Sequence, residues 1–374
     1  MSHPWSAEPQ ELPYKPAESE YGWVDGDGWH PAATRDALVA RCRTGTPPMA
    51  VWTPEAPRVQ LPGEVSWLRE ALAEAAGEPS ARRPARIVLV VLGLVMLGAW
   101  WYLDRAIPQL LYLGAGALVL AGLLWASAAS RARERTRALS PDEIAAVRAE
   151  AAHARWLRAQ KVTYTLYITY AIAAVGLCQI VAEGGGIDAA GLVPSMVRAG
   201  EWWRLATAPL LHGNFLHFFL NYAALQAFAR MLEAHTHRAY VSLSFVVSAI
   251  AGGLASFLLP PEVKSIGASG GIMGLLGTLL VLGLLRRRYL PPHFARSLWA
   301  TVGATAVLGL VGWTYIDNAA HLGGLVAGAV IGLLFLPHRD APTVVPGRTV
   351  VLLGDLSMGA VGLAAAWAVW AMLR

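Results

Sequence analysis

Charged side chains are scarce in this chain: they make up 15% of its 374 residues, whereas hydrophobic residues make up 55%. In soluble domains about a quarter of the residues are charged. The composition therefore excludes an ordinary soluble protein and favours a protein with many membrane spans. Cysteine is scarce as well. Cys42 lies in a polar region and Cys178 in an apolar segment, so we expect no disulfide, and the redox compartment stays unconstrained.

A signal peptide and a nucleic-acid-binding charge pattern are also missing. The first residues, MSHPWSAEPQ, contain no basic segment followed by an apolar run, so we expect no cleaved signal peptide. The formal net charge is +5, but the basic residues sit in short loops between apolar segments. Membrane topology explains that placement, because Lys and Arg gather in cytoplasmic loops. We therefore expect no nucleic-acid partner.

The first 80 residues form a polar region ahead of the apolar ones. Residues 1–20 are rich in Pro and Glu, which is typical of a flexible tail. Residues 21–80 are expected to form a small α+β domain. Within it, YGWVDGDGWH predicts a hairpin that turns between Asp25 and Gly28, ATRDALVARCR has helical spacing, and MAVWTPEAP is typical of a strand that ends at Pro54.

The order W-V-x-G-x-G, short helix, V-W-T-P resembles the GYF-like domains at the cytoplasmic ends of some bacterial membrane proteins. The resemblance implies a docking module and does not identify its partner. An unrelated small domain, or a partly disordered tail, is the alternative interpretation.

Nine apolar segments follow, each long enough to cross the hydrocarbon core as a helix. Two of them, at 87–103 and 110–129, predict a transmembrane hairpin within residues 81–130. Residues 131–161 are basic, and Ser140-Pro141 predicts the start of a solvated cytoplasmic helix that serves as a linker. The other seven segments lie within residues 162–374, at 162–182, 214–232, 240–259, 267–285, 297–316, 319–336 and 350–373. The expected fold class is an all-α polytopic membrane protein with a small α+β domain.

Basic clusters predict the orientation of these spans. They lie at 82–86, 131–137, 230–238, 286–296 and 338–348, and all fall on one side if nine helices cross in order. That side is expected to be the cytoplasm, which places the N-terminal domain inside and the C-terminus outside. The last span contains Asp355, and a carboxylate at membrane depth usually faces the bundle or marks function.

Three spans carry polar side chains close to their starts. Ser269 lies in SIGASGGIMGLLGTLL, His321 in NAAHLGGLVAGAVIGLLF, and His217 with Asn221 in NFLHFFLNYAAL. These spans all start on the non-cytoplasmic side, so the polar groups are expected at similar depth in one leaflet. Polar groups at membrane depth are costly and tend to be functional.

Glycines predict that two of these helices touch. Gly324 and Gly328 follow His321 by three and seven residues and share its helix face. On the serine helix the corresponding small residues are Gly267, Gly270 and Gly277. Small residues at such spacings let membrane helices approach to backbone contact.

These side chains suit peptide-bond hydrolysis. A serine hydroxyl is a weak nucleophile, and the imidazole of His321 can take its proton and return it to a leaving amine. The oxyanion needs donors, which His217, Asn221 and the N–H of Ser269 at a helix N-terminus can supply. Asp317 lies four residues before His321, at the loop end, so we favour a Ser–His dyad over a triad. We expect no metal and no cofactor.

The same motifs resemble those of the rhomboid intramembrane serine proteases. They are GASG with Ser269, AHLGGLVAG with His321, HGNFLHFFLN with His217 and Asn221, and EWWRLATAPLLHG with Trp203 and Arg204. The resemblance covers about residues 162–336, and the segment at 350–373 matches the seventh helix that some members have.

The resemblance implies a six-helix bundle plus a seventh span, with Ser269 as nucleophile, His321 as base, and the other two polar side chains as oxyanion donors. It implies substrates with a single transmembrane helix, cut near its non-cytoplasmic end at small residues and entering past the span at 297–316. Trp202, Trp203 and Arg204 would lie at the membrane interface. We expect an integral protein of a bacterial plasma membrane.

One position departs from the family pattern. Members often carry an aromatic residue one turn below the serine, against which the histidine ring stacks, and this chain has Met273 there. Because sulfur also packs against aromatic rings, we expect activity, with the base less rigidly held.

Two alternatives come from other functional classes. A catalytically inactive rhomboid-like protein would bind membrane clients without cutting them, but such relatives typically lose the serine or the histidine, and both are present here. A transporter or channel predicts ionisable residues deep in the core spans and an inverted repeat. Apart from Asp355, the sequence has neither.

Overall fold

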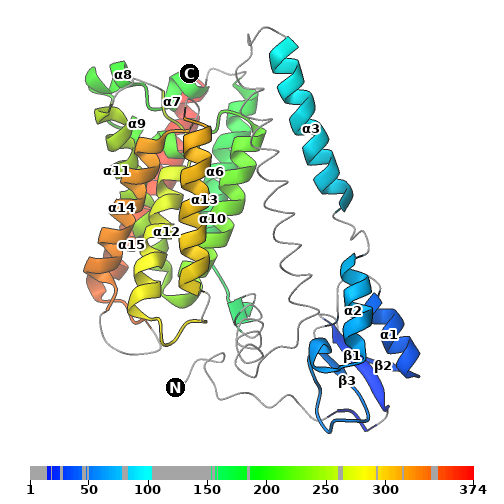
Figure 1. Cartoon of the computed structure of the whole chain (residues 1–374). Coiled ribbons are helices and arrows are strands. Elements are labelled where there is room, and N and C mark those ends of the chain that lie inside the picture. The colour runs from blue at the N-terminus through cyan, green and yellow to red at the C-terminus, as the bar shows by residue number, and fades with distance from the viewer. Residues whose placement is uncertain are drawn as a thin grey trace. The chain divides into compact units, whose positions relative to one another are not determined.

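The computed structural model contains two compact units, which are described one at a time (Figure 1). The described residues are 15–17, 19–25, 28–43, 48, 50–77, 83–102, 153, 156–157, 159–182, 186–259, 264–291, 294–313, 316–337 and 344–374. The predicted span at 110–129, most of the tail at 1–20 and most of the linker at 131–161 lie outside these residues.

The N-terminal unit contains a three-stranded antiparallel sheet in the order β2-β1-β3. Strand β1 (Tyr21–Asp25) pairs with β2 (Gly28–Ala32) so that Asp25 lies opposite Gly28, which confirms the predicted hairpin. Strand β3 (Ala50–Trp52) pairs with the other edge of β1. The remaining elements are α1 (Arg35–Arg43), η1 (Pro62–Glu64), α2 (Leu68–Gly77) and the apolar α3 (Arg83–Tyr102), which overlaps the predicted span at 87–103.

The C-terminal unit contains one long helix for each of the seven spans expected within residues 162–374. They are α6 (Tyr164–Val181), α10 (Phe215–His235), α11 (Arg238–Leu258), α12 (Ser269–Leu285), α13 (Phe294–Val311), α14 (Asn318–Phe335) and α15 (Arg348–Met372). Four short elements lie between α6 and α10: α7 (Gly186–Ala190), α8 (Pro194–Arg198), α9 (Arg204–Thr207) and η2 (Ala208–Leu210). The largest difference from the predicted bounds is at the end of α13, which stops at Val311 rather than at residue 316.

Four of these helices, α6, α11, α14 and α15, are long and apolar enough to cross a membrane. Helices α12 and α13 are apolar over shorter lengths. Helix α10 is long, but His217, Asn221 and Glu233 lower its hydropathy. Together with the apolar composition, these helices make the chain a multi-pass integral membrane protein.

Helix α12 lies at the centre of the bundle, and its residues from 270 to 283 are all buried (Figure 1). Its contact with α14 is made by glycines. An added Cβ at Gly324 would overlap the carbonyl of Gly270, and one at Gly328 would overlap the carbonyl of Gly274. The two backbones therefore touch, and any larger side chain would push the helices apart.

Helix α12 contacts α11 and α14 at the next turn as well. A Cβ at Gly271 would lie 2.7 Å from the ring of Phe245 on α11, and one at Gly277 would lie 2.8 Å from the amide nitrogen of Ala329 on α14. The hydroxyl oxygen of Thr278 lies 2.9 Å both from Ser244 Oγ and from the carbonyl oxygen of Gly328. Three helices are thus joined below the candidate site.

Helix α15, the seventh, packs against α11 and α6. The Ser242 hydroxyl on α11 donates to the carbonyl of Gly354 at 2.6 Å. Asp355, the carboxylate in the last predicted span, has an exposed side chain that accepts a hydrogen bond from the Tyr164 hydroxyl at 2.5 Å. This residue therefore joins two helices at the outside of the bundle.

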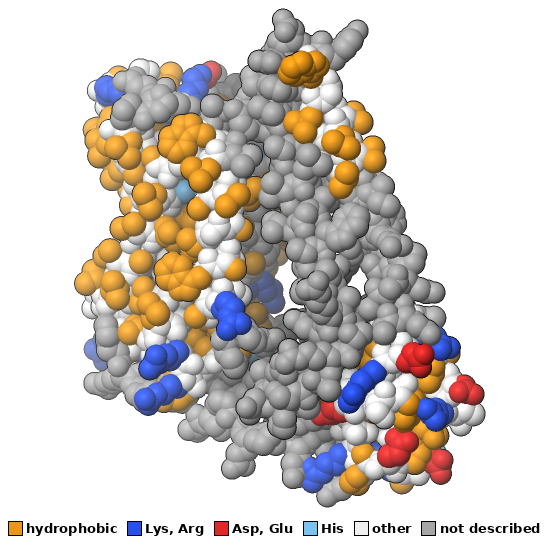
Figure 2. All heavy atoms as spheres, viewed as in Figure 1, with side chains coloured by type: hydrophobic (Ala, Val, Ile, Leu, Met, Phe, Trp, Pro, Cys, Tyr) orange, Lys and Arg blue, Asp and Glu red, His pale blue; other side chains and the backbone are white. Residues whose placement is uncertain are grey.

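Apolar side chains cover much of the face of the bundle seen in Figure 2, with few charged groups among them. The exposed ones include Phe215 and Phe219 on α10, Trp299 and Leu310 on α13, Leu322 and Val326 on α14, and Leu356 and Leu363 on α15. Such a surface suits contact with lipid chains rather than with water.

Candidate active site

Ser269 is the first residue of α12, and its side chain is half-buried. Gly267, two residues earlier, has a φ of 117°, which glycine adopts far more readily than other residues. A Cβ there would also lie 2.7 Å from the His217 ring. Gly267 is therefore not a helix-packing glycine, contrary to the sequence-based expectation: it turns the chain into α12 and leaves room for an imidazole.

The segment that presents Ser269 is held by backbone hydrogen bonds. Ser265 and Leu192 bond to each other in both directions, with N···O distances of 3.0 and 3.1 Å. The N–H of Gly267 donates to the carbonyl of Ala208 at 3.0 Å. The loop between α6 and α10 therefore fixes the approach to the serine.

His321 lies in the first turn of α14 and is half-buried. A Cβ at Gly270, the residue after the serine, would lie 3.5 Å from the carbonyl oxygen of Ala320, the residue before the histidine. Their backbones are therefore adjacent. Within the described residues, no hydrogen bond joins the Ser269 hydroxyl to the His321 ring, and in substrate-free sites such bonds are often long.

His217 and Asn221 lie in the first two turns of α10, which begins with Asn214 as its N-cap. The side chain of Asn214 accepts from the N–H of His217 at 2.8 Å. A Cβ at Gly267 would lie 2.7 Å from His217 Nε2 and 3.7 Å from Asn221 Nδ2, so both side chains reach the turn before the serine.

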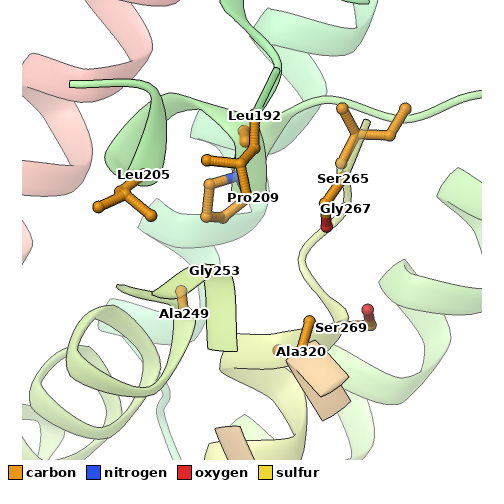
Figure 3. A pocket seen from close by; sticks show the side chains of 12 residues that line it. Leu192, Leu205, Pro209, Ala249, Gly253, Ser265, Gly267, Ser269 and Ala320 are labelled. Carbon is orange, nitrogen blue, oxygen red and sulfur yellow. The ribbon is translucent and has the colours of Figure 1, made fainter. Parts of the chain in front are cut away.

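A small cavity adjoins the serine (Figure 3). Ser269 and Ala320 lie together on one side of it, and Leu192 and Pro209 lie opposite. Its other lining residues are Leu205, Ala208, Ala249, Gly253, Ser265, Ile266, Gly267 and Gly270. Most of these residues are apolar or glycine, and Ser265 and Ser269 contribute hydroxyl groups.

The Trp202-Trp203-Arg204 motif lies at the start of α9. Trp202 is exposed and meets the Phe257 ring edge-on, whereas Trp203 packs against Trp367 of α15 at 5.9 Å between ring centroids. Arg204 is only 3% exposed and donates to the carbonyls of Asp188 and Gly191 at 3.0 and 2.7 Å. Of the three, only Trp202 fits the expected place at the membrane interface, and Arg204 instead holds the loop together from inside.

The sequence pointed to two further residues, Met273 and Asp317, as ones that could affect how His321 is held. Met273, one turn below the serine, is buried at 7% exposure within the bundle core. Asp317 is the N-cap of α14: one carboxylate oxygen accepts from the N–H of Ala320 at 2.9 Å and the other from the Ser265 hydroxyl at 2.5 Å. Within the described residues it makes no hydrogen bond to the His321 ring.

Sequence reasoning missed Glu233 as a structural residue. It is 8% exposed near the end of α10, and it accepts from the N–H groups of Thr163, Tyr164 and Thr165 at 2.6, 3.0 and 2.9 Å. A carboxylate satisfies the free N–H groups at the start of α6 and suits the helix dipole. The signal was a lone acid within an otherwise apolar helix.

His212 was also missed, although it lies in the HGN motif just before α10. Burial lowers the pKa of this imidazole to about 4, so the ring is neutral at physiological pH. It meets the His217 ring edge-on at 5.1 Å between centroids. A neutral ring can pack there without placing a charge beside the candidate oxyanion site.

No group of three or more His, Cys, Asp or Glu side chains in the described ranges is arranged to hold a metal ion. Both cysteines are free. The residues gathered at the site are a hydroxyl, two imidazoles and an amide, which together can carry out acyl transfer.

Known proteins resemble this chain over the same region. The family model described as the rhomboid domain matches residues 199–338, which contain α9 to α14. The "Rhomboid protease GluP" of Bacillus subtilis (strain 168) is 33% identical in an alignment of 188 residues that covers 46% of this chain and 36% of that protein. "RHOMBOID-like protein 6, mitochondrial" of Arabidopsis thaliana is 30% identical over 143 residues, 38% of this chain and 46% of that protein.

A third relative is matched over most of its length. The "Putative rhomboid protease YdcA" of Bacillus subtilis (strain 168) is 30% identical over 145 residues, 38% of this chain and 72% of that protein. The chain spans less than half of the other two relatives. From the bundle, the motif residues at the heads of α10, α12 and α14 and these matches, we conclude that the chain belongs to the rhomboid family.

Proposed function

We propose that this chain is an active intramembrane serine endopeptidase that cuts transmembrane helices of other membrane proteins with a Ser269–His321 dyad. Rhomboid family members are generally intramembrane serine proteases that act on transmembrane substrates. The observation that carries the proposal is the glycine contact between α12 and α14, because it brings the backbone of Ser269 beside the turn that carries His321. Packing alone does not require a serine and a histidine at the heads of the two helices in contact.

The proposed reaction begins when the His321 imidazole takes the proton from Ser269 Oγ as this oxygen attacks the scissile carbonyl carbon. The imidazolium then gives that proton to the leaving amine, which departs with one half of the substrate. Water hydrolyses the acyl-enzyme by the same proton transfers, and the serine hydroxyl is restored. Each turnover consumes one water and requires no cofactor.

The oxyanion of each tetrahedral intermediate is stabilised by donors that are already in place. The N–H of Gly213 points at His217 Nδ1, 3.5 Å away, which leaves Nε2 to carry the ring proton on the side toward Gly267. One N–H of the Asn221 amide donates to the carbonyl of His217 at 3.1 Å, and the other is available to the substrate. The N–H of Ser269 adds the positive end of the α12 dipole.

The orientation of the chain follows from its basic loops. Arg286, Arg287 and Arg288 directly follow α12, and Arg238 begins α11, at the ends of these helices remote from the candidate site. Because basic loops stay in the cytoplasm, we place the N-terminal domain inside and the dyad near the outer face of a bacterial plasma membrane. Substrates would then be cut close to their non-cytoplasmic ends.

The proposal is tested by a serine-directed fluorophosphonate probe on the full-length protein in detergent. We expect labelling of the wild type, and none of Ser269→Ala or His321→Ala, because the probe reacts only with an activated hydroxyl. Ser297→Ala on α13 is the matched control, since its hydroxyl only donates to the Phe294 carbonyl within its own helix, and it keeps full labelling. Equal labelling of Ser269→Ala and the wild type contradicts the proposal.

A further inference from the structure

The hydrogen bond between Ser265 and Asp317 joins the segments that lead into the two catalytic helices. Ser265 lies four residues before Ser269, and Asp317 lies four residues before His321. The Ser265 hydroxyl donates to Asp317 Oδ2 at 2.5 Å, and both side chains are half-buried. This hydrogen bond therefore joins the segment that precedes α12 to the N-cap residue of α14.

We propose that this contact is a brace that keeps the nucleophile and the base in register, so that Ser265 and Asp317 are positioning residues. The inference rests on the proposed Ser269–His321 function and extends it to two residues outside the dyad and the oxyanion donors. The carboxylate acts on the position of the base through the backbone of α14, whose first turn it caps.

The Asp317 end of the brace is built into the first turn of α14. Its Oδ1 accepts from the N–H of Ala320 at 2.9 Å, and its backbone carbonyl accepts from the N–H of His321 at 3.0 Å. Any displacement of Asp317 therefore rotates or loosens the turn that carries the base. Both carboxylate oxygens are engaged, one along α14 and one across to Ser265.

The Ser265 end is anchored just as firmly. Its N–H and carbonyl both bond to Leu192, and two residues later the N–H of Gly267 bonds to Ala208. The hydroxyl thus projects from a fixed backbone. A hydrogen bond to an ionised carboxylate is about twice as strong as one between neutral groups, so this one can resist small relative movements.

The brace adds a side-chain contact ahead of the glycine contacts, which begin at Gly270, the second residue of α12, and at Gly324, three residues after His321. The contact of α12 with α14 is tightest at Gly270–Gly324 and Gly274–Gly328, below the serine and the histidine. Helix ends fray unless they are capped or packed. A misplacement of about 1 Å between reacting groups can cost about a hundredfold in rate, so the ends require their own constraint.

The test measures steady-state cleavage of a synthetic single-span substrate by the full chain in proteoliposomes. We expect Ser265→Ala to lower kcat about tenfold with KM unchanged, because bound substrate still meets a misaligned dyad. Ser265→Thr keeps a hydroxyl and restores kcat to within about twofold of the wild type.

A second variant separates the brace from the helix cap. Asp317→Ser keeps an N-cap oxygen but is too short to reach Ser265 as well. The double variant Ser265→Ala/Asp317→Ser is expected to have the same kcat as Asp317→Ser alone, because both substitutions break the same contact. Additive losses would overturn the brace.

The control is Ser242→Ala, which removes a similar hydrogen bond, at 2.6 Å to the Gly354 carbonyl, away from the site. We expect this variant to have a lower midpoint of thermal unfolding and an unchanged kcat. A wild-type kcat for Ser265→Ala, or an equal loss of kcat in Ser242→Ala, would overturn the inference while cleavage itself persists. A wild type that neither cuts nor reacts with a fluorophosphonate would instead overturn the proposed function, and the inference with it.

Discussion

Helices α12 and α13 are neighbours in sequence, yet they are held in opposite ways. Residues 270 to 283 of α12 are buried without interruption, and its glycines meet α11 and α14 at backbone distance. In α13, Trp299 and Leu310 are 55% and 68% exposed, and a Cβ at Gly303 would meet nothing within 4 Å. One helix is fixed within the bundle, and the other lies against its outside.

This difference separates two requirements of the proposed reaction. The dyad needs fixed geometry, which the buried α12–α14 contact supplies. A transmembrane substrate has to enter from the lipid, which needs a helix that can move aside at low cost. The few ties of α13 include Asn318 Nδ2, which donates to the Gly309 carbonyl at 3.0 Å, and the buried side chains of Phe294 and Leu298.

The largest effect is expected from a bulky residue in the α12–α14 contact. Gly328→Leu would force its side chain into the Gly274 carbonyl, so we expect a loss of at least about 3 kcal/mol of stability or failure to fold. The matched change on α13 is Gly303→Leu, which faces open space and is expected to stay within about 0.5 kcal/mol. Intrinsic tryptophan fluorescence during thermal unfolding measures both. Equal midpoints of thermal unfolding for the two variants would contradict the difference in packing between α12 and α13.

The next largest effect is expected from the two candidate oxyanion donors on α10. His217→Ala and Asn221→Ala are each expected to lower kcat about a hundredfold, because each removes one oxyanion donor. Gln226→Ala on the same helix removes a hydrogen bond to Thr169 Oγ1 at 2.7 Å and serves as the control at wild-type kcat. Wild-type turnover in either of the first two variants would exclude that residue from the role.

A third prediction compares the two helices directly by amide hydrogen exchange. Local opening is easiest where few buried contacts hold an element. We expect amides in the middle of α12 to exchange at least about tenfold more slowly than those in the middle of α13, measured by mass spectrometry in detergent. Indistinguishable rates would show that α13 is as firmly held as α12.

The smallest effect is expected where α13 is tied to α14. Asn318→Ala removes the hydrogen bond to Gly309, so α13 moves aside at a lower free-energy cost. We expect kcat/KM for a transmembrane substrate to rise about two- to fivefold, mainly through a lower KM. Thr301→Ala, whose hydroxyl bonds only to the Ser297 carbonyl within α13, is the control. A fall in kcat/KM for Asn318→Ala would contradict this role for α13.

The seven helices of the bundle could be predicted from sequence because long apolar runs have few alternatives in a membrane. The hairpin of the N-terminal unit was predictable too, since its turn residues and alternating side chains are local signals. Glycine spacing indicated which faces of α12 and α14 meet. All of these depend on residues close together in the chain.

The polar ties of the site could not be predicted in the same way. Glu233 caps a helix that begins 69 residues earlier at Tyr164, and Ser265 meets Asp317 across 52 residues. Nothing local in the sequence says which of several polar groups will pair once the helices pack. The buried position of Arg204 was missed as well. Glu201, three residues earlier, pairs with it at 2.7 Å, but its other partners are the backbone carbonyls of Asp188 and Gly191, which leave no sequence signal.

The central claim is that Ser269 is the nucleophile of an intramembrane protease. Its most direct test is cleavage of a synthetic single-span membrane substrate by the full chain in proteoliposomes, with the wild type beside Ser269→Ala at equal folded amounts. We expect one cut in the substrate helix near its non-cytoplasmic end by the wild type, and none by the variant. Cleavage by Ser269→Ala at the wild-type rate would contradict it.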